Sequence, residues 1–249
     1  MPCRCFTALD DGSKKVVSDD VSTISIPAAA APANIAGPLL QCRALRFGWS
    51  SAEPLSQAFD LDVSLTSRVG ILGANGTGKS TFLKTLAGEI PALAGEVYQS
   101  SRIKVQYFSQ HVADNFNLAL CPVEILHEAF PDATEQEIRG HLGSFGVRTQ
   151  ALVVLAHLSG GEKTRVALAV ITFEPPHILL MDEPTNHLDI NTVTAITDGL
   201  KQFSGGLVVV SHDRRLIEAL ELDCYMLSSK TRVWSRTTLK RFLAHVKPK

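Results

Sequence analysis

The chain has 249 residues, of which 45% are hydrophobic and 20% are charged. This length and balance predict a globular protein with one sizeable α/β domain or two small ones. The formal net charge of −1 excludes a global field that steers the chain to nucleic acid or to an anionic membrane, although a local basic face stays open. The apolar runs are shorter than a bilayer-crossing helix requires, so we expect no membrane insertion.

The first part of the chain, residues 1–40, differs in composition from the rest. It contains early acidic pairs and a Pro- and Ala-rich stretch over 26–32, which favours a flexible leader or linker over a targeting sequence. Cys3 and Cys5 could be half of a metal site, but no second Cys or His pair follows at ligand spacing. The five cysteines are scattered and odd in number, so we expect no disulfide framework and a cytoplasmic protein.

Two stretches, 39–66 and 95–109, predict short strands of an antiparallel layer, with the best runs at 41–47 and 97–108. Gln110 comes directly after the second stretch and ends the run 107–110, and its amide is able to touch both Mg²⁺ and an attacking water. A lone Gln after a strand is weak evidence on its own.

A glycine-rich loop lies between these stretches. It follows the apolar run 68–72, which predicts a buried strand, and it precedes a predicted helix over 80–89. The loop reads GANGTGKS and matches the phosphate-loop pattern, in which backbone N–H groups surround phosphate oxygens. We expect Lys79 to reach the β and γ phosphates and Ser80 to hold Mg²⁺. The alternative is a glycine-rich turn with a surface lysine. The predicted ATP-binding residues here are Gly73, Ala74, Asn75, Gly76, Thr77, Gly78, Lys79, Ser80 and Thr81.

Residues 122–158 predict a helical region, in which Thr134 and Glu137 form a capping box that starts one helix. The LSGGE segment over 158–162 comes next, before a predicted helix over 163–173. A serine hydroxyl, free N–H groups and a positive helix end make a second anion site there. The alternative is an ordinary helix N-cap. The predicted contact residues of this segment are Ser159, Gly160, Gly161 and Glu162.

One ATP does not need two γ-phosphate sites in one chain. The arrangement that uses both is a pair of domains facing head to tail, so that each LSGGE segment caps the other's phosphate loop.

A second buried strand over 178–181 ends in two acids. Two adjacent carboxylates where a strand leaves the core carry an electrostatic cost unless they have a role. We expect Asp182 to enter the Mg²⁺ shell and Glu183 to act as general base, or at least to position the attacking water. The alternative is a polar strand end that starts a turn at Pro184.

A helix over 191–203 and a third buried strand over 207–210 follow. His212 comes after this strand and is able to donate to a γ-phosphate oxygen, although a lone His is more often a surface or capping residue. Alternating strands and helices predict an α/β fold with a mostly parallel sheet covered on both faces.

The ordered set of phosphate loop, Gln110, LSGGE, ILLMDE and SHD resembles the ATP-binding cassette ATPase domain over about residues 40–235. The sequence DEPTNHLD, over 182–189, resembles the ABC-F branch, whose soluble members are linked to ribosomes and translation. The stretches 107–111 and 138–146 look most like the C-terminal cassette of a eukaryotic ABC-F protein.

The resemblance implies a P-loop NTPase fold with an antiparallel layer and an inserted helical lobe. We place the cassette at 41–236, its lobe at about 111–165 and a helical tail at 237–249. The resemblance also implies that Trp49 stacks on adenine where the family usually has Tyr, the alternative being a core aromatic of the β layer. Asp189 would meet the opposing cassette's site, and Glu162 stands where Gln is commoner.

ABC-F proteins carry two cassettes, whereas this sequence has one phosphate loop and one LSGGE segment. We therefore expect an ATPase that binds and hydrolyses Mg-ATP between itself and a second cassette, with the ribosome or rRNA as a further partner. Two alternatives stay open: the ATPase subunit of a membrane transporter, and an ATP-binding module that does not hydrolyse.

Overall fold

The computed structural model describes residues 24–32, 37–50, 52–109, 112–228 and 230–245. The strands are β1 (Leu40–Arg46), β2 (Phe59–Val63), β3 (Arg68–Leu72), β4 (Ala94–Gln99), β5 (Val105–Phe108), β6 (Ile178–Asp182), β7 (Gly206–Val210), β8 (Asp223–Leu227) and β9 (Trp234–Thr237). The helices are α1 (Lys79–Leu86), α2 (Pro122–Ala129), α3 (Glu135–Ser144), α4 (Gly160–Thr172), α5 (Ile190–Gln202), α6 (Arg214–Ala219) and α7 (Leu239–His245), with 3-10 turns at Val112–Asn115 and Leu155–His157.

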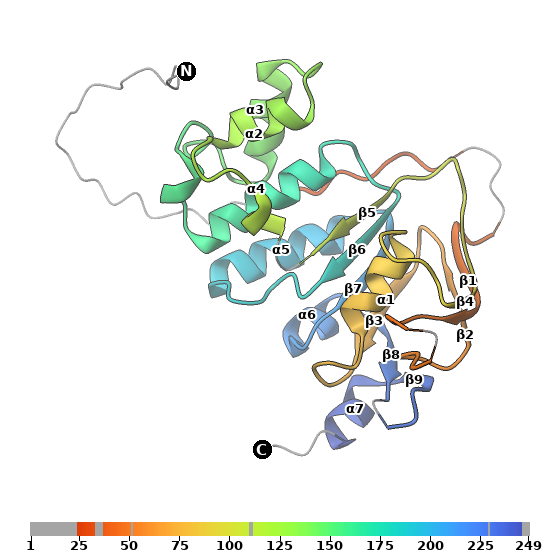
Figure 1. Cartoon of the computed structure of the whole chain (residues 1–249). Coiled ribbons are helices and arrows are strands. Elements are labelled where there is room, and N and C mark those ends of the chain that lie inside the picture. Colours follow the sequence, from red (N-terminus) through yellow and green to blue (C-terminus); the bar gives the residue numbers. More distant parts are fainter. Residues whose placement is uncertain (1–23, 33–36, 51, 110–111, 229, 246–249) are drawn as a thin grey trace, which may run out of the picture.

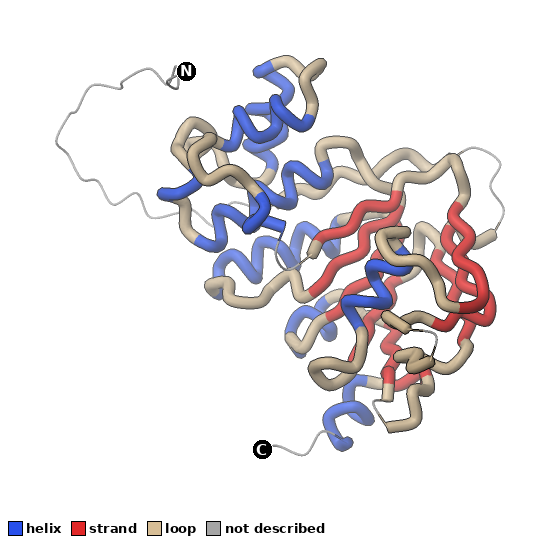
Figure 2. Tube along the Cα trace, in the orientation of Figure 1, coloured by secondary structure: helices blue, strands red, loops and turns tan. Residues whose placement is uncertain are grey.

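A six-stranded sheet in the order β5-β6-β7-β3-β8-β9 forms the centre of the molecule (Figure 2). The pairs from β5 to β8 are parallel, and β9 is antiparallel to β8 at the edge. The mostly parallel core predicted from the sequence is therefore confirmed. The strands β8 and β9 had no counterpart among the predicted elements.

Alternate side chains of the central strands enter two separate hydrophobic cores. Ile178 and Leu180 of β6 pack with α1 and the antiparallel layer, whereas Leu179 and Met181 pack with the helices on the other face. This alternation follows from the two-residue repeat of a strand, and both faces are covered as parallel sheets require. Figure 1 shows α1 on one side of the sheet and α5 and α6 on the other.

A smaller antiparallel sheet in the order β2-β1-β4 lies beside α1, as the sequence predicted. The assignment of the whole run 97–108 to this layer was wrong. Its last part, β5, pairs in parallel with β6, with Val105 opposite Ile178 and Phe108 opposite Met181. A short apolar run shows that a strand is present but does not specify its partner.

The helices α2, α3 and α4 form the lobe at one end of the molecule (Figure 1). The predicted capping box is present, because the Thr134 hydroxyl accepts from the Glu137 N–H and the Glu137 carboxylate accepts from Thr134. Two predicted helices differ from the structure by three residues at one end: α1 ends at Leu86 rather than at 89, and α4 begins at Gly160 rather than at 163.

Residues 24–29, which we name the strap, depart from the flexible leader predicted for 1–40. Ile24 and Ile26 are buried in the same core as the lobe helices. The Ser25 N–H donates to the Ser144 carbonyl at 2.9 Å, and the Ala29 N–H donates to the Pro176 carbonyl at 3.0 Å. Part of the predicted leader is therefore packed against the domain, whereas residues 1–23, with Cys3 and Cys5, lie outside the described residues.

Candidate nucleotide site

The phosphate loop has the conformation that its glycines predict. Gly76 and Gly78 have φ values of 79° and 98°, in the left-handed region that glycine enters without steric cost. A β-carbon on Gly78 would lie 2.8 Å from the Leu55 side chain, whereas one on Gly76 would meet no atom within 4 Å. The loop therefore packs against Leu55 at Gly78 and is open at Gly76, where a ligand can approach its backbone.

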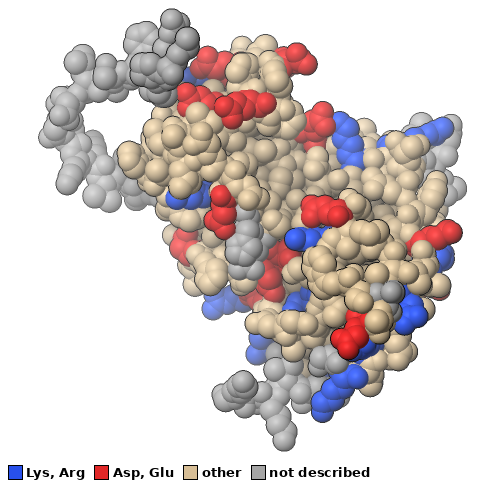
Figure 3. All heavy atoms as spheres, viewed as in Figure 1, with Lys and Arg blue, Asp and Glu red and all other residues tan. Residues whose placement is uncertain are grey.

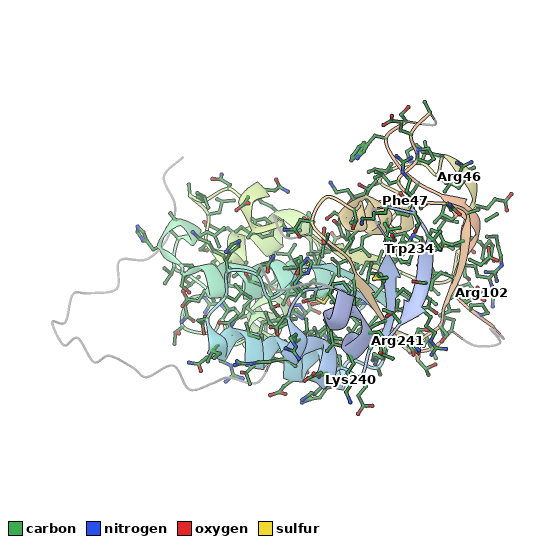
Figure 4. All side chains as sticks on the ribbon, turned by 90° about the horizontal axis from the view of Figure 1, so that it is seen from below. Arg46, Phe47, Arg102, Trp234, Lys240 and Arg241 are labelled. Carbon is green, nitrogen blue, oxygen red and sulfur yellow. The ribbon has the colours of Figure 1, made fainter. Side chains whose placement is uncertain are left out.

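An aromatic cluster supports the helix that follows this loop. The ring of Phe82 on α1 lies 5.5 Å from Phe47 and 4.5 Å from Trp234, measured between ring centroids. Trp234 also stacks on Phe59 at 4.6 Å. Figure 4 shows Phe47 and Trp234 coming together from different parts of the chain. The antiparallel layer and β9 therefore hold the start of α1, and with it the loop, in place.

Lys79 lies inside the loop rather than on the surface. Its ammonium donates to the carbonyls of Gly73 at 2.9 Å and Ala74 at 3.1 Å, and the residue is 7% exposed. Burial lowers the pKa of Lys79, and the nearby carboxylates of Glu183 and Asp182 act in the opposite direction. The alternative of a turn with a surface lysine is excluded by this geometry. A bound phosphate would supply a stronger acceptor than the two carbonyls.

The two acids at the end of β6 are buried beside Lys79. Asp182 is 5% exposed, and the Tyr107 hydroxyl lies 3.4 Å from its Oδ2 atom. Burial, together with the Asp182 charge, raises the pKa of Tyr107, so this hydroxyl stays protonated. Glu183 follows with a φ of 49°, which is uncommon for a residue with a side chain. Its N–H still donates to the Val210 carbonyl at 2.9 Å, so the sheet fixes this turn.

Glu183 and His212 contact each other through two bonds. The His212 N–H donates to Glu183 Oε2 at 3.2 Å, and His212 Nε2 lies 3.1 Å from Glu183 Oε1. Burial raises the pKa of Glu183, which is 9% exposed. Burial and the Lys79 charge lower the pKa of His212. At neutral pH the contact is therefore a hydrogen bond from a neutral imidazole, and it fixes the orientation of the Glu183 carboxylate.

The signature segment, residues 158–162, forms the N-terminus of α4. The Ser159 hydroxyl accepts from the Glu162 N–H at 3.3 Å, and the Glu162 carboxylate accepts from the Ser159 N–H at 2.7 Å. This is a capping box, so within this chain the segment acts as a helix N-cap, which was the alternative interpretation. Ser159 and Gly160 are exposed. An exposed helix N-terminus stays available to an anion from outside the chain.

The signature segment and the N-terminus of α5 touch each other. A β-carbon on Gly161 would lie 2.6 Å from Thr192 Oγ1 and 3.0 Å from Asp189 Oδ2. Asp189 caps α5 by accepting from the Asn191 and Thr192 N–H groups at 3.0 Å and 2.9 Å, and from the Thr192 hydroxyl at 2.7 Å. The Thr192 bonds hold the pKa of Asp189 below its usual value.

The predicted site residues fall into two groups. Lys79, Asp182, Glu183 and His212 come together at one edge of the core sheet, whereas Ser159 to Glu162 lie with Asp189 at the lobe. Within the described part of the chain, the bonds of Ser159 and Glu162 stay in the first turn of α4. Trp49 is 72% exposed, so it is not a core aromatic of the β layer. Ser80 is exposed beside the loop, and Gln110 lies outside the described residues.

Two contributors were missed by the sequence analysis. Tyr107 reaches Asp182, and its only signal was its place in the run before Gln110. Thr192 bonds to Asp189 and lies against Gly161, and its signal was the spacing of a helix N-terminus, three residues after the cap.

The family model described as "ABC transporter" matches residues 56–186, a range that includes the phosphate loop, the signature segment and both buried acids. The chain belongs to the ATP-binding cassette family. Several of its relatives carry F-family names. "ABC transporter F family member 3" of Arabidopsis thaliana is 40% identical over 192 residues, or 77% of this chain and 27% of the relative. "Protein GCN20" of Saccharomyces cerevisiae is 38% identical over 206 residues, or 82% and 26%. The ABC-F resemblance is confirmed.

This cassette spans about a quarter to a third of the length of such relatives. "Probable ATP-binding protein YheS" of Escherichia coli is 39% identical over 80% of this chain and 31% of its own length. Among solved structures, a bacterial Atm1-family ABC exporter with ATP bound matches with a TM-score of 0.71 at 19% identity, over 92% of this chain and 45% of the exporter. That match shows the fold. Among the described residues, no helix has the length and apolar character to cross a bilayer.

Proposed function

We propose that this ABC-F cassette hydrolyses Mg-ATP at a site completed by a second cassette. The observation that carries the proposal is that its predicted phosphate contacts form two groups, each with its own set of bonds. Lys79, Glu183 and His212 converge beside one phosphate loop, whereas Ser159 and Gly160 are exposed at a helix N-terminus where, among the described residues, the Ser159 and Glu162 bonds stay within α4. A phosphate that binds both halves has to lie between two chains or two domains.

The residues at the loop have distinct roles in this proposal. Lys79 and His212 stabilise charge on the transferred phosphoryl group. Glu183, aimed by His212 and with a pKa raised by burial, accepts a proton from the attacking water. Gln110 orients the same water.

Mg²⁺ fits the oxygen donors beside the loop. The Ser80 hydroxyl and the buried Asp182 carboxylate are hard ligands of the type that Mg²⁺ takes, with Gln110 as a third candidate. When bound, the ion would neutralise phosphate charge. This chain's part is to hold Asp182 in place, which the Tyr107 hydroxyl at 3.4 Å supports.

The likeness to ABC-F proteins supports a soluble, cytoplasmic role linked to translation, with the ribosome or rRNA as a partner. Charge alone adds little support, because Lys and Arg are interspersed with Asp and Glu on the face in Figure 3. The translation link therefore rests on family likeness, whereas the ATPase role rests on the site.

The decisive experiment is the Glu183→Gln variant, whose amide keeps the size of the side chain but cannot take a proton. We expect turnover to fall by about 10²–10⁴-fold while ATP still binds. Sedimentation of this variant with and without Mg-ATP, at several protein concentrations, tests pairing directly. Unchanged turnover contradicts the role of Glu183.

The unmodified chain distinguishes the proposal from its alternatives. If it pairs with itself, its ATPase rate per chain rises with protein concentration. Nucleotide binding with negligible hydrolysis at every concentration would favour an ATP-binding module, unless a second cassette added in trans restores turnover. Co-purification with membranes rather than ribosomes would favour a transporter subunit.

A further inference from the structure

The strap joins three elements that are far apart in the sequence. Its Ser25 N–H bonds to the Ser144 carbonyl at the end of α3, and its Ala29 N–H bonds to the Pro176 carbonyl between α4 and β6. Ile24, which is 1% exposed, lies against α5. A β-carbon on Gly199 of α5 would be 2.9 Å from the Ile24 carbonyl oxygen and 3.1 Å from its Cγ2 atom. The absence of a side chain at Gly199 therefore allows the strap to lie directly on α5.

The strap contacts α5 directly and bonds to the chain just after α4, and these two helices carry Asp189 and the signature segment at their other ends. α4 begins with Gly160 and Gly161, and α5 begins directly after Asp189. At that end, Gly161 packs on Asp189 and Thr192. Each helix has 13 residues and is about 20 Å long. The pair is thus joined near one end by the strap and at the other by the signature contact.

We propose that the strap is a positioning element for the signature segment. By fixing α5 against the end of α4, it sets how Ser159 and Gly160 are presented to a partner's phosphate. Close-packed interiors transmit strain, so we expect a shift at Gly199 to change the contact at Gly161. The inference rests on the proposed pairing with a second cassette. The Ala29 bond reaches Pro176 just before β6, whereas Glu183 comes directly after β6, so this contact and the catalytic acid lie at opposite ends of that strand.

Two substitutions displace the strap without adding charge. Gly199→Ala places a methyl group against the Ile24 backbone, and Ile24→Ala removes the buried side chain. Ile24→Val is the conservative rescue, since it keeps a branched apolar group. Gly140→Ala in α3 is the matched control, because a β-carbon there meets no atom within 4 Å. The Gly199 and Gly140 changes add the same atom to a helix and differ only in what that atom contacts.

The variants are compared in the Glu183→Gln chain by sedimentation with Mg-ATP, by nucleotide binding, and by amide hydrogen exchange at 24–29, 159–165 and 189–193. We expect Gly199→Ala and Ile24→Ala to keep ATP affinity, weaken pairing by about 3–30-fold and speed exchange at both helix N-termini. Gly140→Ala and Ile24→Val should behave like the parent chain.

The outcomes test the positioning role of the strap separately from the proposed function. Unchanged pairing and unchanged exchange at 159–165, in variants whose strap amides have lost protection, would overturn the positioning role. Pairing that fails in every chain, the parent included, counts against the proposed function instead. In that case the positioning role is tested by exchange at 159–165 alone. Equal exchange rates in Gly199→Ala and Gly140→Ala would overturn that role.

Discussion

Gly161 of the signature segment packs directly against Asp189, with a β-carbon position 3.0 Å from the Asp189 Oδ2 atom. Thr192 Oγ1 lies closer still, at 2.6 Å, and it donates to that carboxylate at 2.7 Å. The glycine is thus required by contact within one chain, whatever it does toward a partner. A β-carbon on Gly160 beside it would meet no atom within 4 Å, so the two glycines of the segment have different reasons to be there.

Gly161→Ala and Gly160→Ala should therefore differ in stability. The methyl group at Gly161 has no room, and we expect a loss of about 1–3 kcal/mol, as for other overpacked sites. The same change at Gly160 should be neutral or stabilise by up to about 1 kcal/mol, because alanine favours helix. Urea unfolding at equilibrium gives both values. Equal stabilities for the two variants would contradict the packing of Gly161 on Asp189 and Thr192.

Replacing Glu183 by Gln should stabilise the folded chain in a pH-dependent way. Burial raises the pKa of Glu183, so the folded chain holds this proton more tightly than the unfolded chain. That contribution to stability is complete below the unfolded pKa of about 4.3 and is lost as pH rises through the folded pKa. At neutral pH the ionised carboxylate is therefore a cost, and Gln removes it while still accepting from the His212 N–H.

Thermal unfolding between pH 5 and pH 8 measures this effect. We expect the Tm of Glu183→Gln to exceed that of the parent at pH 8, and the difference to shrink toward pH 5. His212 acts in the opposite sense, because burial and Lys79 lower its pKa and its contribution is lost as pH falls. Because His212 contacts Glu183 directly, the comparison is repeated in a His212→Ala background, which removes the titration of the imidazole from both chains. A Tm difference that grows as pH falls would mean that burial does not raise the Glu183 pKa.

Local patterns predicted the conformation of the glycine-rich loop well because its elements are adjacent in the chain. The strand before Gly73, the left-handed turns at Gly76 and Gly78 and the helix from Lys79 form one continuous unit. The proximity of Asp182 to Lys79 could be inferred because parallel strands end at the same edge of a sheet. The same reasoning placed His212 beyond the end of β7.

Long-range packing escaped the sequence analysis. The stretch around Ile24 contains Pro and many Ala residues, which suggests a linker, and its burial depends on the space above Gly199. The parallel partner of Val105 and the strands β8 and β9 were also missed, because apolar alternation does not identify neighbours. Composition reports local preference, whereas each of these features depends on residues far away in the sequence.

Tyr107→Phe should weaken the hold on Asp182. The hydroxyl lies 3.4 Å from Asp182 Oδ2, a long hydrogen bond, so we expect a stability loss of about 0.5–1 kcal/mol. Groups that orient a metal ligand typically matter about 10–100-fold for metal affinity, and the length of this bond favours the low end. Titration of ATP binding with Mg²⁺ measures it. Tyr98→Phe, at a side chain that is 58% exposed, is the control. Equal Mg²⁺ dependence in the two variants would remove Tyr107 from the site.

Asp189→Ala should cost stability that does not depend on pH in the neutral range. The carboxylate caps α5 through two N–H groups and the Thr192 hydroxyl, and loss of such a cap costs about 1 kcal/mol. Bonds from Thr192 lower the pKa of Asp189, so its contribution is present above the unfolded pKa of about 3.9 and is lost only as pH falls through the folded value. Urea unfolding at pH 5 and pH 8 should give the same loss. Asp189→Asn keeps an acceptor oxygen and should recover most of it, whereas equal losses for Asn and Ala would show that the charge, rather than the cap, stabilises α5.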